Sequence, residues 1–394
     1  MPSISDIVLN NIESISNSYA LNIAEPGHVI EELSKNLRGK DSFIKTFERI
    51  DPITDRSMIA VDGGNAMEQL AGGDLLVAGA TIGEGLSTKP LYDTIEEYPS
   101  EAFFEFLPHT SNNDKIQKAI RAALELRIHQ QTPADIKIID GAYLGNVSTV
   151  LYALLDSDPK VSNAILKLNN FDKDGLLKDA IKALLNPSRK NLTDVIAVVK
   201  SDSSSVFAKK FMKDYSIKEV NLTDRILASR ILLPGEFFSA RSMDSNPALV
   251  ATIAKGLSSR LQEESLDLAA LNKMVKGNQD ALARLGANDI TEEDVLWTTY
   301  FKPTAWSRYA KAIKIEFAFY NTTTTESLED FTRKVVQIVD QDIVEENILE
   351  PWCQYTADVG AKGVSQAMNI IKSHLMASAD EDEALRSFVR NYRT

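Results

Sequence analysis

The chain has 394 residues, of which 44% are hydrophobic, enough to bury the core of one large domain with insertions or of two ordinary domains. No apolar run approaches the roughly 18 residues that a membrane-spanning helix needs, and residues 1–11 lack the plan of a secretory signal, so we expect a cytoplasmic protein that makes no contact with membranes. The formal net charge of -13 argues against an extensive polynucleotide-binding surface, although a local basic path into a site is compatible with it.

The few cysteine and histidine residues restrict the kind of metal site that the chain can build. The single cysteine, Cys353, cannot form an internal disulfide, and the four histidines lie far apart without the spacing of a zinc site. Any metal must therefore be held mainly by carboxylate oxygens, which favour magnesium or manganese.

Residues 1–48 are predicted to form an N-terminal helical arm. Apolar residues within 7–15 are spaced for one helix face, Pro26-Gly27 interrupts the pattern, and a second helix is expected to end near Arg38. Such an arm could pack against the rest of the protein or dock a partner, and packing is the simpler interpretation. Residues 49–394 contain no repeat or proline-rich linker and are predicted to form one domain.

From residue 57 the pattern changes to short apolar runs bounded by glycine, which is typical of strands. The predicted elements, in order, are strands at 57–61, 74–83 and 102–107, a helix at 112–131, a strand at 136–139, a lysine-rich helical insertion at about 143–190 and a strand at 194–199. This succession matches an α/β, ribonuclease H-like fold, in which a mixed sheet is flanked by helices.

The remaining elements are predicted to extend the same domain. They are a helical insertion at about 246–293, a strand at 311–320 and closing helices at 330–346 and 361–377.

Two aspartates stand where predicted strands give way to glycine. Asp62 lies in AVDGG at residues 60–64, and Asp140 lies in IIDG at residues 138–141. If these strands are parallel neighbours, both side chains emerge at the carboxyl edge of the sheet, where open α/β sheets bind ligands. One Asp-Gly pair usually marks only a turn, but two on adjacent strands favour a site. Carboxylates this close repel one another unless a divalent cation lies between them, and pairs of such ions cleave phosphodiester bonds.

Two further acids have both a structural and a functional interpretation. Glu125, on the helix before the fourth strand, could pair with Arg121 at i, i+4 spacing. Asp358, placed just before the last long helix, could serve as its N-cap. Taken singly, each residue favours the structural role.

Basic residues suggest where a nucleic acid would bind. Lys200 ends the fifth predicted strand, on the same edge as the aspartates, and Lys209, Lys210 and Lys213 follow on a predicted helix. A second basic cluster is interleaved with aromatic residues and consists of Lys302, Trp306, Arg308, Tyr309, Lys311 and Lys314. Cations combined with stacking faces suit a single strand, but a solvated helical face with a buried tryptophan explains the second cluster equally well.

The order of these signatures resembles the NurA family of nucleases. It comprises AVDGG at 60–64, the helix carrying Glu125, IDG at 139–141, the strand at 195–200, LPGE at 233–236 and KIEF at 314–317. The similarity spans roughly residues 55–375, and its specificity comes from order and spacing, since each signature is short.

The resemblance implies a nuclease that favours manganese, acts on single strands and DNA ends, forms a homodimer and works with HerA, a hexameric ATP-driven translocase. It implies that Asp62, Glu125 and Asp140 bind the metal. Many family members also place a tyrosine and, eight positions later, a histidine beside the metals, whereas this chain has Glu350 and Asp358 at that spacing. A carboxylate can replace histidine as a ligand of a hard metal, so Asp358 is the expected fourth ligand.

The leading hypothesis is therefore two-metal hydrolysis of DNA at Asp62, Glu125, Asp140 and Asp358, with Lys200 steadying a phosphate, in DNA repair or genome defence. Because Glu350 and Asp358 depart from the family pattern, one alternative is a catalytically weakened subunit with a structural or regulatory role on a HerA-type ring. Another is a ribonuclease H-like enzyme that acts on RNA or on a hybrid.

Overall fold

The computed structural model describes residues 27–39, 43–86, 88–91, 99–154, 158, 160–161, 164, 175–185, 195–200, 202–243, 296–319 and 326–379. The apolar pattern at 7–15 and the predicted insertion at 246–293 lie outside the described residues.

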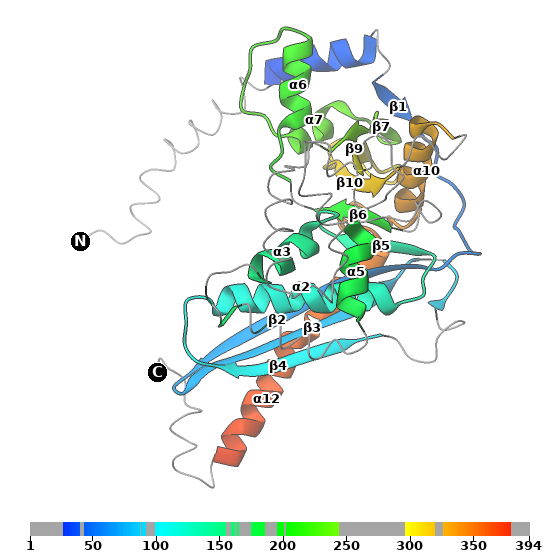
Figure 1. Ribbon diagram of the computed structural model, residues 1–394. Helices are drawn as coiled ribbons and strands as arrows, with labels where there is room; N and C mark the ends of the chain where they lie inside the picture. Colours follow the sequence, from blue (N-terminus) through cyan, green and yellow to red (C-terminus); the bar gives the residue numbers. More distant parts are fainter. Residues whose placement is uncertain are drawn as a thin grey trace.

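A mixed sheet organises the fold, with ten strands in the described part of the chain (Figure 1). Its order is β1-β7-β9-β10-β6-β5-β2-β3-β4, and β8 pairs with β9. The strands are β1 (Ile44–Thr46), β2 (Met58–Leu70), β3 (Gly73–Glu84), β4 (Glu101–Leu107), β5 (Ile136–Asp140), β6 (Val195–Val199), β7 (Glu236–Phe238), β8 (Arg241–Ser242), β9 (Leu296–Lys302) and β10 (Ile313–Ala318). β5 runs parallel to β2 and to β6, and the other pairings are antiparallel.

Helices cover both faces of this sheet. They are a helix at residues 27–39, α2 (Asn113–Gln131), α3 (Gly145–Leu154), α5 (Leu176–Leu185), α6 (Val206–Asp214), α7 (Asp224–Ile231), α10 (Leu328–Gln341), α11 (Trp352–Ala361) and α12 (Gly363–Ala379). α2 packs on β2 and β3, and α3 and α5 pack on α2, whereas α12 crosses β2 and β3 from the other side (Figure 1). The expected α/β sheet flanked by helices is thus confirmed.

Two predictions about individual elements were wrong. Asp62 does not close its strand, because β2 continues to Leu70 in an antiparallel pairing with β3 along its whole length. Asp358 does not cap the last long helix, α12, but lies within α11, a helix that was not predicted from the sequence. β9 was missed as well, although its sequence LWTTYFK is rich in β-branched and aromatic residues.

The core has a main part and a smaller second part. The main cluster joins the centre of the sheet to α2, α10 and α11. The second cluster joins the helix at 27–39 to α6 and α7 over Phe238 and Tyr300, and it includes Leu33 and Leu37. The apolar face of this N-terminal helix is therefore buried within the protein itself.

The LPGE motif at 233–236 ties this helix to the sheet. Gly235 has a φ of 80°, in the left-handed region that favours glycine, and the turn delivers Glu236 to Arg38. Both guanidinium nitrogens of Arg38 donate to the Glu236 carboxylate at 2.8 Å, and one also donates to the carbonyl of Ile231 at 2.6 Å. Such forked pairing fixes the orientation of the two groups as well as their distance.

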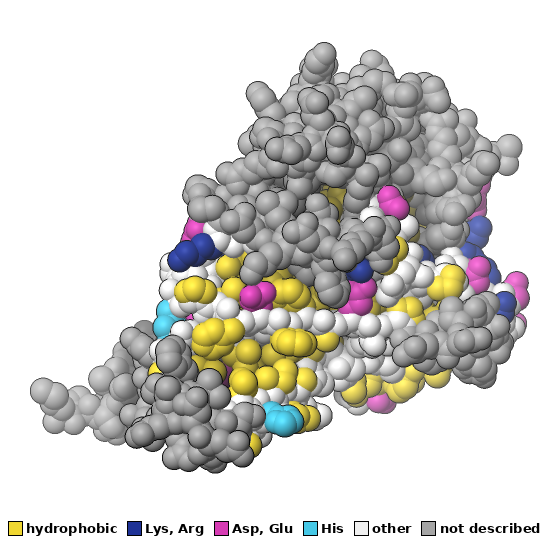
Figure 2. All heavy atoms as spheres, turned by 60° about the horizontal axis from the view of Figure 1, so that its bottom comes forward, with side chains coloured by type: hydrophobic (Ala, Val, Ile, Leu, Met, Phe, Trp, Pro, Cys, Tyr) yellow, Lys and Arg dark blue, Asp and Glu magenta, His cyan; other side chains and the backbone are white. Residues whose placement is uncertain are grey.

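β4 forms one edge of the sheet and exposes Phe104 and Phe106, which are 70% and 46% exposed. On the face that Figure 2 brings forward, apolar side chains gather between scattered acidic, basic and histidine side chains. Among the helices of the described residues, none is both long and apolar enough to cross a bilayer.

α11 lies against the backbone of the sheet, and glycines make this approach possible. A Cβ atom added at Gly83 of β3 would lie 2.1 Å from the carbonyl oxygen of Cys353 and 2.5 Å from the backbone nitrogen of Ala357. A Cβ atom added at Gly64 of β2 would lie 2.0 Å from the carbonyl oxygen of Ala361. Because backbone atoms cannot rotate away, any larger residue must displace the helix.

We predict that Gly83→Ala lowers the free energy of unfolding by about 1–3 kcal/mol, the usual cost of overpacking. Gly363→Ala is the matched control, because a Cβ atom there meets nothing within 4 Å and alanine favours a helix. Urea unfolding followed by circular dichroism measures both variants. Equal midpoints for the two would contradict the tight seating of α11.

Candidate active site

Asp62 and Asp140 lie side by side at the carboxyl edge of two parallel strands. β2 and β5 pair in parallel, and their last paired residues are Val61 and Ile139. Asp62 and Asp140 are the next residue on each strand. The prediction that these strands are parallel neighbours is therefore confirmed, and the two aspartates come directly after the point where their parallel pairing ends.

Glu125 reaches this edge from α2, on the other face of the sheet. A Cβ atom added at Gly63 would lie 2.5 Å from Oε1 of Glu125, so the glycine next to Asp62 leaves the space that the carboxylate occupies. Arg121 lies 3.2 Å from the same oxygen, which is the i, i+4 pair expected from the sequence, and Asn146 donates to Oε2 at 2.6 Å. Glu125 is only 5% exposed, so these contacts hold a buried carboxylate against the strand.

α11 brings further side chains to the face on which the aspartates lie. Successive residues of β2 point to opposite faces, so Asp62 shares the face of Gly64, against which α11 ends. Gln354, fully buried on α11, donates from Nε2 to Oδ1 of Asp140 at 2.5 Å. Asp358, one turn later, is close enough to oppose the ionisation of Asp62 and pairs with Lys362 at 2.6 Å.

Lys200 is the cation closest to the aspartates in the described structure. Its Nζ atom lies 3.0 Å from Oδ2 of Asp140 and 2.5 Å from Oε2 of Glu350. Burial lowers the pKa of Lys200, but the two carboxylates outweigh this effect and hold the pKa above its ordinary value. Lys200 therefore stays charged and neutralises part of the acidic edge.

Asp62, Glu125 and Glu350 resist ionisation. Burial raises the pKa of Asp62 to about 6, and the charge of Asp140 adds to the shift while Lys200 opposes it. Burial also raises the pKa of Glu125 to about 7, against the pull of Arg121 and with a contribution from Asp62. Burial raises the pKa of Glu350 too, although its bond to Lys200 acts in the opposite direction. Carboxylates in this state gain free energy when a cation binds among them.

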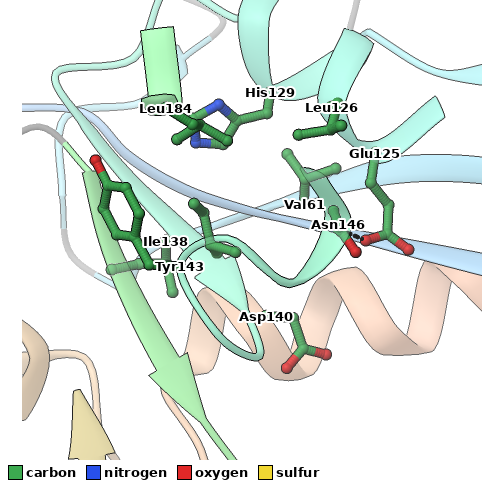
Figure 3. Close-up of a pocket in the computed structure, with 10 residues that line it drawn as sticks. Val61, Glu125, Leu126, His129, Ile138, Asp140, Tyr143, Asn146 and Leu184 are labelled. Carbon is green, nitrogen blue, oxygen red and sulfur yellow. Dashed lines mark hydrogen bonds between the residues drawn. The ribbon is translucent and has the colours of Figure 1, made fainter. Parts of the chain in front are cut away.

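A small buried cavity adjoins Glu125 and Asp140, with a volume of about 10 Å³, room for about one water molecule. Figure 3 shows Glu125 and Asn146 joined by a hydrogen bond at one end of this cavity, while His129 lies near Leu184 at the other. Burial lowers the pKa of His129 to about 3, so its ring is neutral. We interpret His129 as part of the core.

The donor chemistry of the site fits a hard divalent cation. Its oxygen ligands come from four elements, and Oε1 of Gln354 is buried without a hydrogen-bond partner among the described residues. Such an acceptor suits a metal ion or a water molecule bound to one. Among the described residues, however, no three acidic, histidine or cysteine side chains already converge into a coordination shell.

The predicted basic residues outside the acidic site differ in their exposure to solvent. Lys209 and Lys210 are exposed on α6, which packs near β7 and β9 and not beside the aspartates (Figure 1). Arg308 and Lys311 are exposed in the loop between β9 and β10. These four residues stay predictions as nucleic-acid contacts.

Two members of the second cluster are corrected. Trp306 is only 4% exposed, so of the two interpretations offered by the sequence the buried tryptophan fits the structure and the stacking residue does not. Lys302 is fully buried and donates to the carbonyl oxygens of Ser229 and Arg308 at 2.6 and 2.7 Å. Burial lowers the pKa of Lys302 to about 8.

The sequence analysis missed Gln354 and Asn146. Both hold predicted site acids in place, Asp140 and Glu125 respectively, but neither stands in a motif. The available signals were weak. Gln354 lies four residues after Glu350, and Asn146 lies in the predicted insertion that follows Asp140. Glu350 stands out in the sequence, but its contact with Lys200 depends on the fold.

Comparison with known proteins places the fold. No protein-family model and no curated protein matches this sequence. Among solved structures, the NurA nuclease from Sulfolobus solfataricus aligns over 96% of this chain and 98% of its own, with a TM-score of 0.55 and 10% sequence identity. A structure of NurA with manganese aligns over 94% and 98% of the two chains, with a TM-score of 0.47 and 11% identity.

The chain is an α/β protein with a ribonuclease H-like sheet whose parallel edge gathers acidic side chains. Its fold is NurA-like, a conclusion that rests on the first of these two similarities.

We predict that the metal-free protein loses stability as the pH rises from about 4 to about 7. Asp62 and Glu125 bind protons more tightly in the folded state, so the free energy of unfolding falls between their ordinary pKa values of 3.8 and 4.5 and their folded values of about 6 and 7. Each group contributes on the order of 2–3 kcal/mol. Chemical unfolding at a series of pH values in a chelating buffer measures this slope.

Asp62→Asn should make this pH dependence shallower. Asp135→Asn is the control, because hydrogen bonds from Ser57 hold the pKa of Asp135 below its ordinary value of 3.8. This carboxyl is therefore ionised in both states over most of the window, and its loss should leave the fall toward pH 7 unchanged. An unchanged slope in Asp62→Asn would show that this carboxyl ionises as freely in the folded state as in the unfolded chain.

Proposed function

We propose that this protein is a nuclease that hydrolyses phosphodiester bonds of DNA with divalent metal ions. The observation that carries the proposal is the meeting of Asp62 and Asp140 at one parallel edge, with Glu125 and Asp358 reaching it from helices on opposite faces. The likeness of the fold to the NurA nuclease from Sulfolobus solfataricus supports the reaction class.

In this proposal Asp62, Glu125, Asp140 and Asp358 hold manganese or magnesium ions. Such ions activate water for attack on phosphorus and stabilise the leaving oxygen. Oxygen donors favour these metals over zinc. The raised pKa values of Asp62 and Glu125 give a reason for cation binding that is independent of the comparison.

The other side chains of the site orient and balance these acids. Gln354 fixes the rotation of Asp140 by donating to Oδ1, so the other oxygen, Oδ2, is directed toward Lys200. Lys200 shares its charge between Asp140 and Glu350, and its ammonium group would also counter the charge of a phosphate at the edge. Arg121 and Asn146 hold Glu125 close to Asp62.

We further propose action on single strands and DNA ends, a homodimer, and work with a HerA-type hexameric translocase in DNA repair or genome defence. The support for these finer assignments is the order of sequence signatures from AVDGG at 60–64 to KIEF at 314–317.

One observation favours a second candidate, a catalytically weakened subunit that serves a HerA-type ring. Lys200 already neutralises Asp140 and Glu350, and its short contact with Glu350 draws the cation into the acidic edge. A site satisfied in this way binds a metal less readily, since the ion must displace the ammonium group.

We predict that Asp62→Asn lowers manganese-dependent cleavage of single-stranded DNA at least about 100-fold, because asparagine removes a charge from the metal-binding edge. Glu68→Gln is the matched control, since Glu68 lies on the same strand but pairs with Lys372 on α12. A gel assay with end-labelled DNA measures the rates, and circular dichroism checks the fold. Full activity in Asp62→Asn would falsify the assignment.

We predict that the purified protein cleaves DNA in manganese without a partner. A protein that cleaves in neither manganese alone nor manganese with a HerA-type translocase and ATP would support the weakened subunit. Competition between DNA, RNA and hybrid substrates in the same assay separates a deoxyribonuclease from a ribonuclease H-like enzyme.

A further inference from the structure

A second, larger cavity lies on the other half of the sheet, between α6 and strands β8, β9 and β10. Its volume is about 550 Å³, within the roughly 300–1,000 Å³ of small-molecule sites. Lys210 lines it from α6, Arg241 from β8 and Lys314 from β10. One lysine from each of the two basic clusters of the sequence thus faces the same space.

Among the described residues Arg241 forms no ion pair, although the charges of Asp214 and Asp224 act on it. Its guanidinium carbon lies 4.9 Å from the ring centre of Phe43, 5.3 Å from that of Phe207 and 4.7 Å from that of Phe211. Its Nη1 atom is buried and has no hydrogen-bond partner among the described residues. A cation fixed over aromatic rings with an unfilled donor is costly, and an anion in the adjoining cavity would offset that cost.

The acidic side chains around this cavity already have hydrogen-bond or ion-pair partners within the protein. Asp224 is fully buried and accepts hydrogen bonds from the hydroxyl of Ser204 and the backbone nitrogen of Ala208, both at 2.8 Å. Asp202 is paired with Tyr300 and lies 3.5 Å from Lys314. Lys314 also lies 3.0 Å from Glu316. Among the described residues Lys210 pairs with Asp214 alone, at 3.5 Å across an exposed helix turn, so its side chain can turn toward a ligand.

The cavity continues the edge that carries the acidic site. Lys314 is the register partner of Val199 on β6, the residue before Lys200, while Val198 is the partner of Asp140 on β5. β10 is two strands from β5, which is about 10 Å at the usual spacing of about 4.8 Å. Because side chains alternate along a strand, Lys314 lies on the face of the sheet that α2 and Glu125 cover, opposite to the face of Asp140. The cations of the cavity therefore approach the acidic edge from the side of Glu125.

We propose that this cavity, lined by Lys210, Arg241 and Lys314, binds phosphate groups of a single polynucleotide strand whose cleaved bond lies at Asp62 and Asp140. This inference rests on the proposed nuclease function and adds the path of the substrate. A row of cations matches the successive phosphates of one strand. Trp297, half-buried on the cavity wall, supplies an aromatic side chain beside that path.

The test is binding of a dye-labelled oligothymidine of about 16 nucleotides, measured by fluorescence anisotropy in a chelating buffer so that no cleavage occurs. Lys210→Glu should weaken binding on the order of tenfold and reduce the salt dependence by about 0.7 per lost phosphate contact. Ser242→Asp, which adds a negative charge to the cavity wall from β8, should weaken binding in the same way. Arg241 is left intact, because its loss would open the aromatic cluster beneath it.

Lys334→Glu is the matched control, since Lys334 is an exposed lysine on another helix, α10, and does not line the cavity. Equal weakening by Lys334→Glu and Lys210→Glu would overturn the proposal, because it would reflect general charge alone. Unchanged binding in both Lys210→Glu and Ser242→Asp would overturn it as well. The proposal would also be overturned if Lys210→Glu weakened the binding of inorganic phosphate or thymidine monophosphate but left the binding of the oligonucleotide unchanged.

Because binding is measured without metal, its outcome is independent of cleavage. A strand that binds through Lys210 but is never cut in manganese would remove the nuclease function and keep the cavity as a strand-binding site. A strand that is cut equally well by the wild type and by both cavity variants, with unchanged affinity, would keep the nuclease and remove the cavity.

Discussion

Repulsion among carboxylates at the edge of β2 and β5 is the constraint on which the rest of the structure depends. The parallel register brings Asp62 and Asp140 level with each other, and Gly63 admits Glu125 from α2. Neutralising contacts surround this charge: Lys200 pairs with Asp140, and Arg121 pairs with Glu125. The elements around the site are thus positioned where they supply positive charge, and a divalent cation would neutralise the negative charge that remains.

The two halves of the sheet carry side chains of opposite charge. The half with β2, β3 and β5 carries the acids, and the half with β8, β9 and β10 carries cations around a cavity. β6 joins the halves, since it pairs with β5 on one side and β10 on the other and ends next to Lys200. An acidic protein with a net charge of -13 can in this way keep a basic path beside an acidic centre.

The sequence predicted the parts of the site that depend on local pattern. An apolar run followed by Asp-Gly marked both Asp62 and Asp140, because strand edge and side-chain type are adjacent in the chain. The contribution of Glu125 depends on space beside Gly63, 62 positions away, and the roles of Gln354 and Glu350 depend on where α11 lands. α11 itself begins after Pro351 and has polar residues around its circumference, which left its periodicity weak. The sequence left two interpretations of Trp306 open, because an aromatic residue among lysines looks the same in sequence whether it is buried or exposed.

The packing of α11 against Gly64 and Gly83 separates the sequence positions that can change from those that cannot. Positions 64 and 83 meet main-chain atoms, so they admit no larger residue whatever chemistry the helix carries. Side chains borne by the helix and its approach, at 350, 354 and 358, face the acidic edge without setting the distance between helix and sheet. Evolution can therefore exchange the chemical groups at these positions while the distance between helix and sheet stays fixed. The pair Glu350 and Asp358 is one such set of groups.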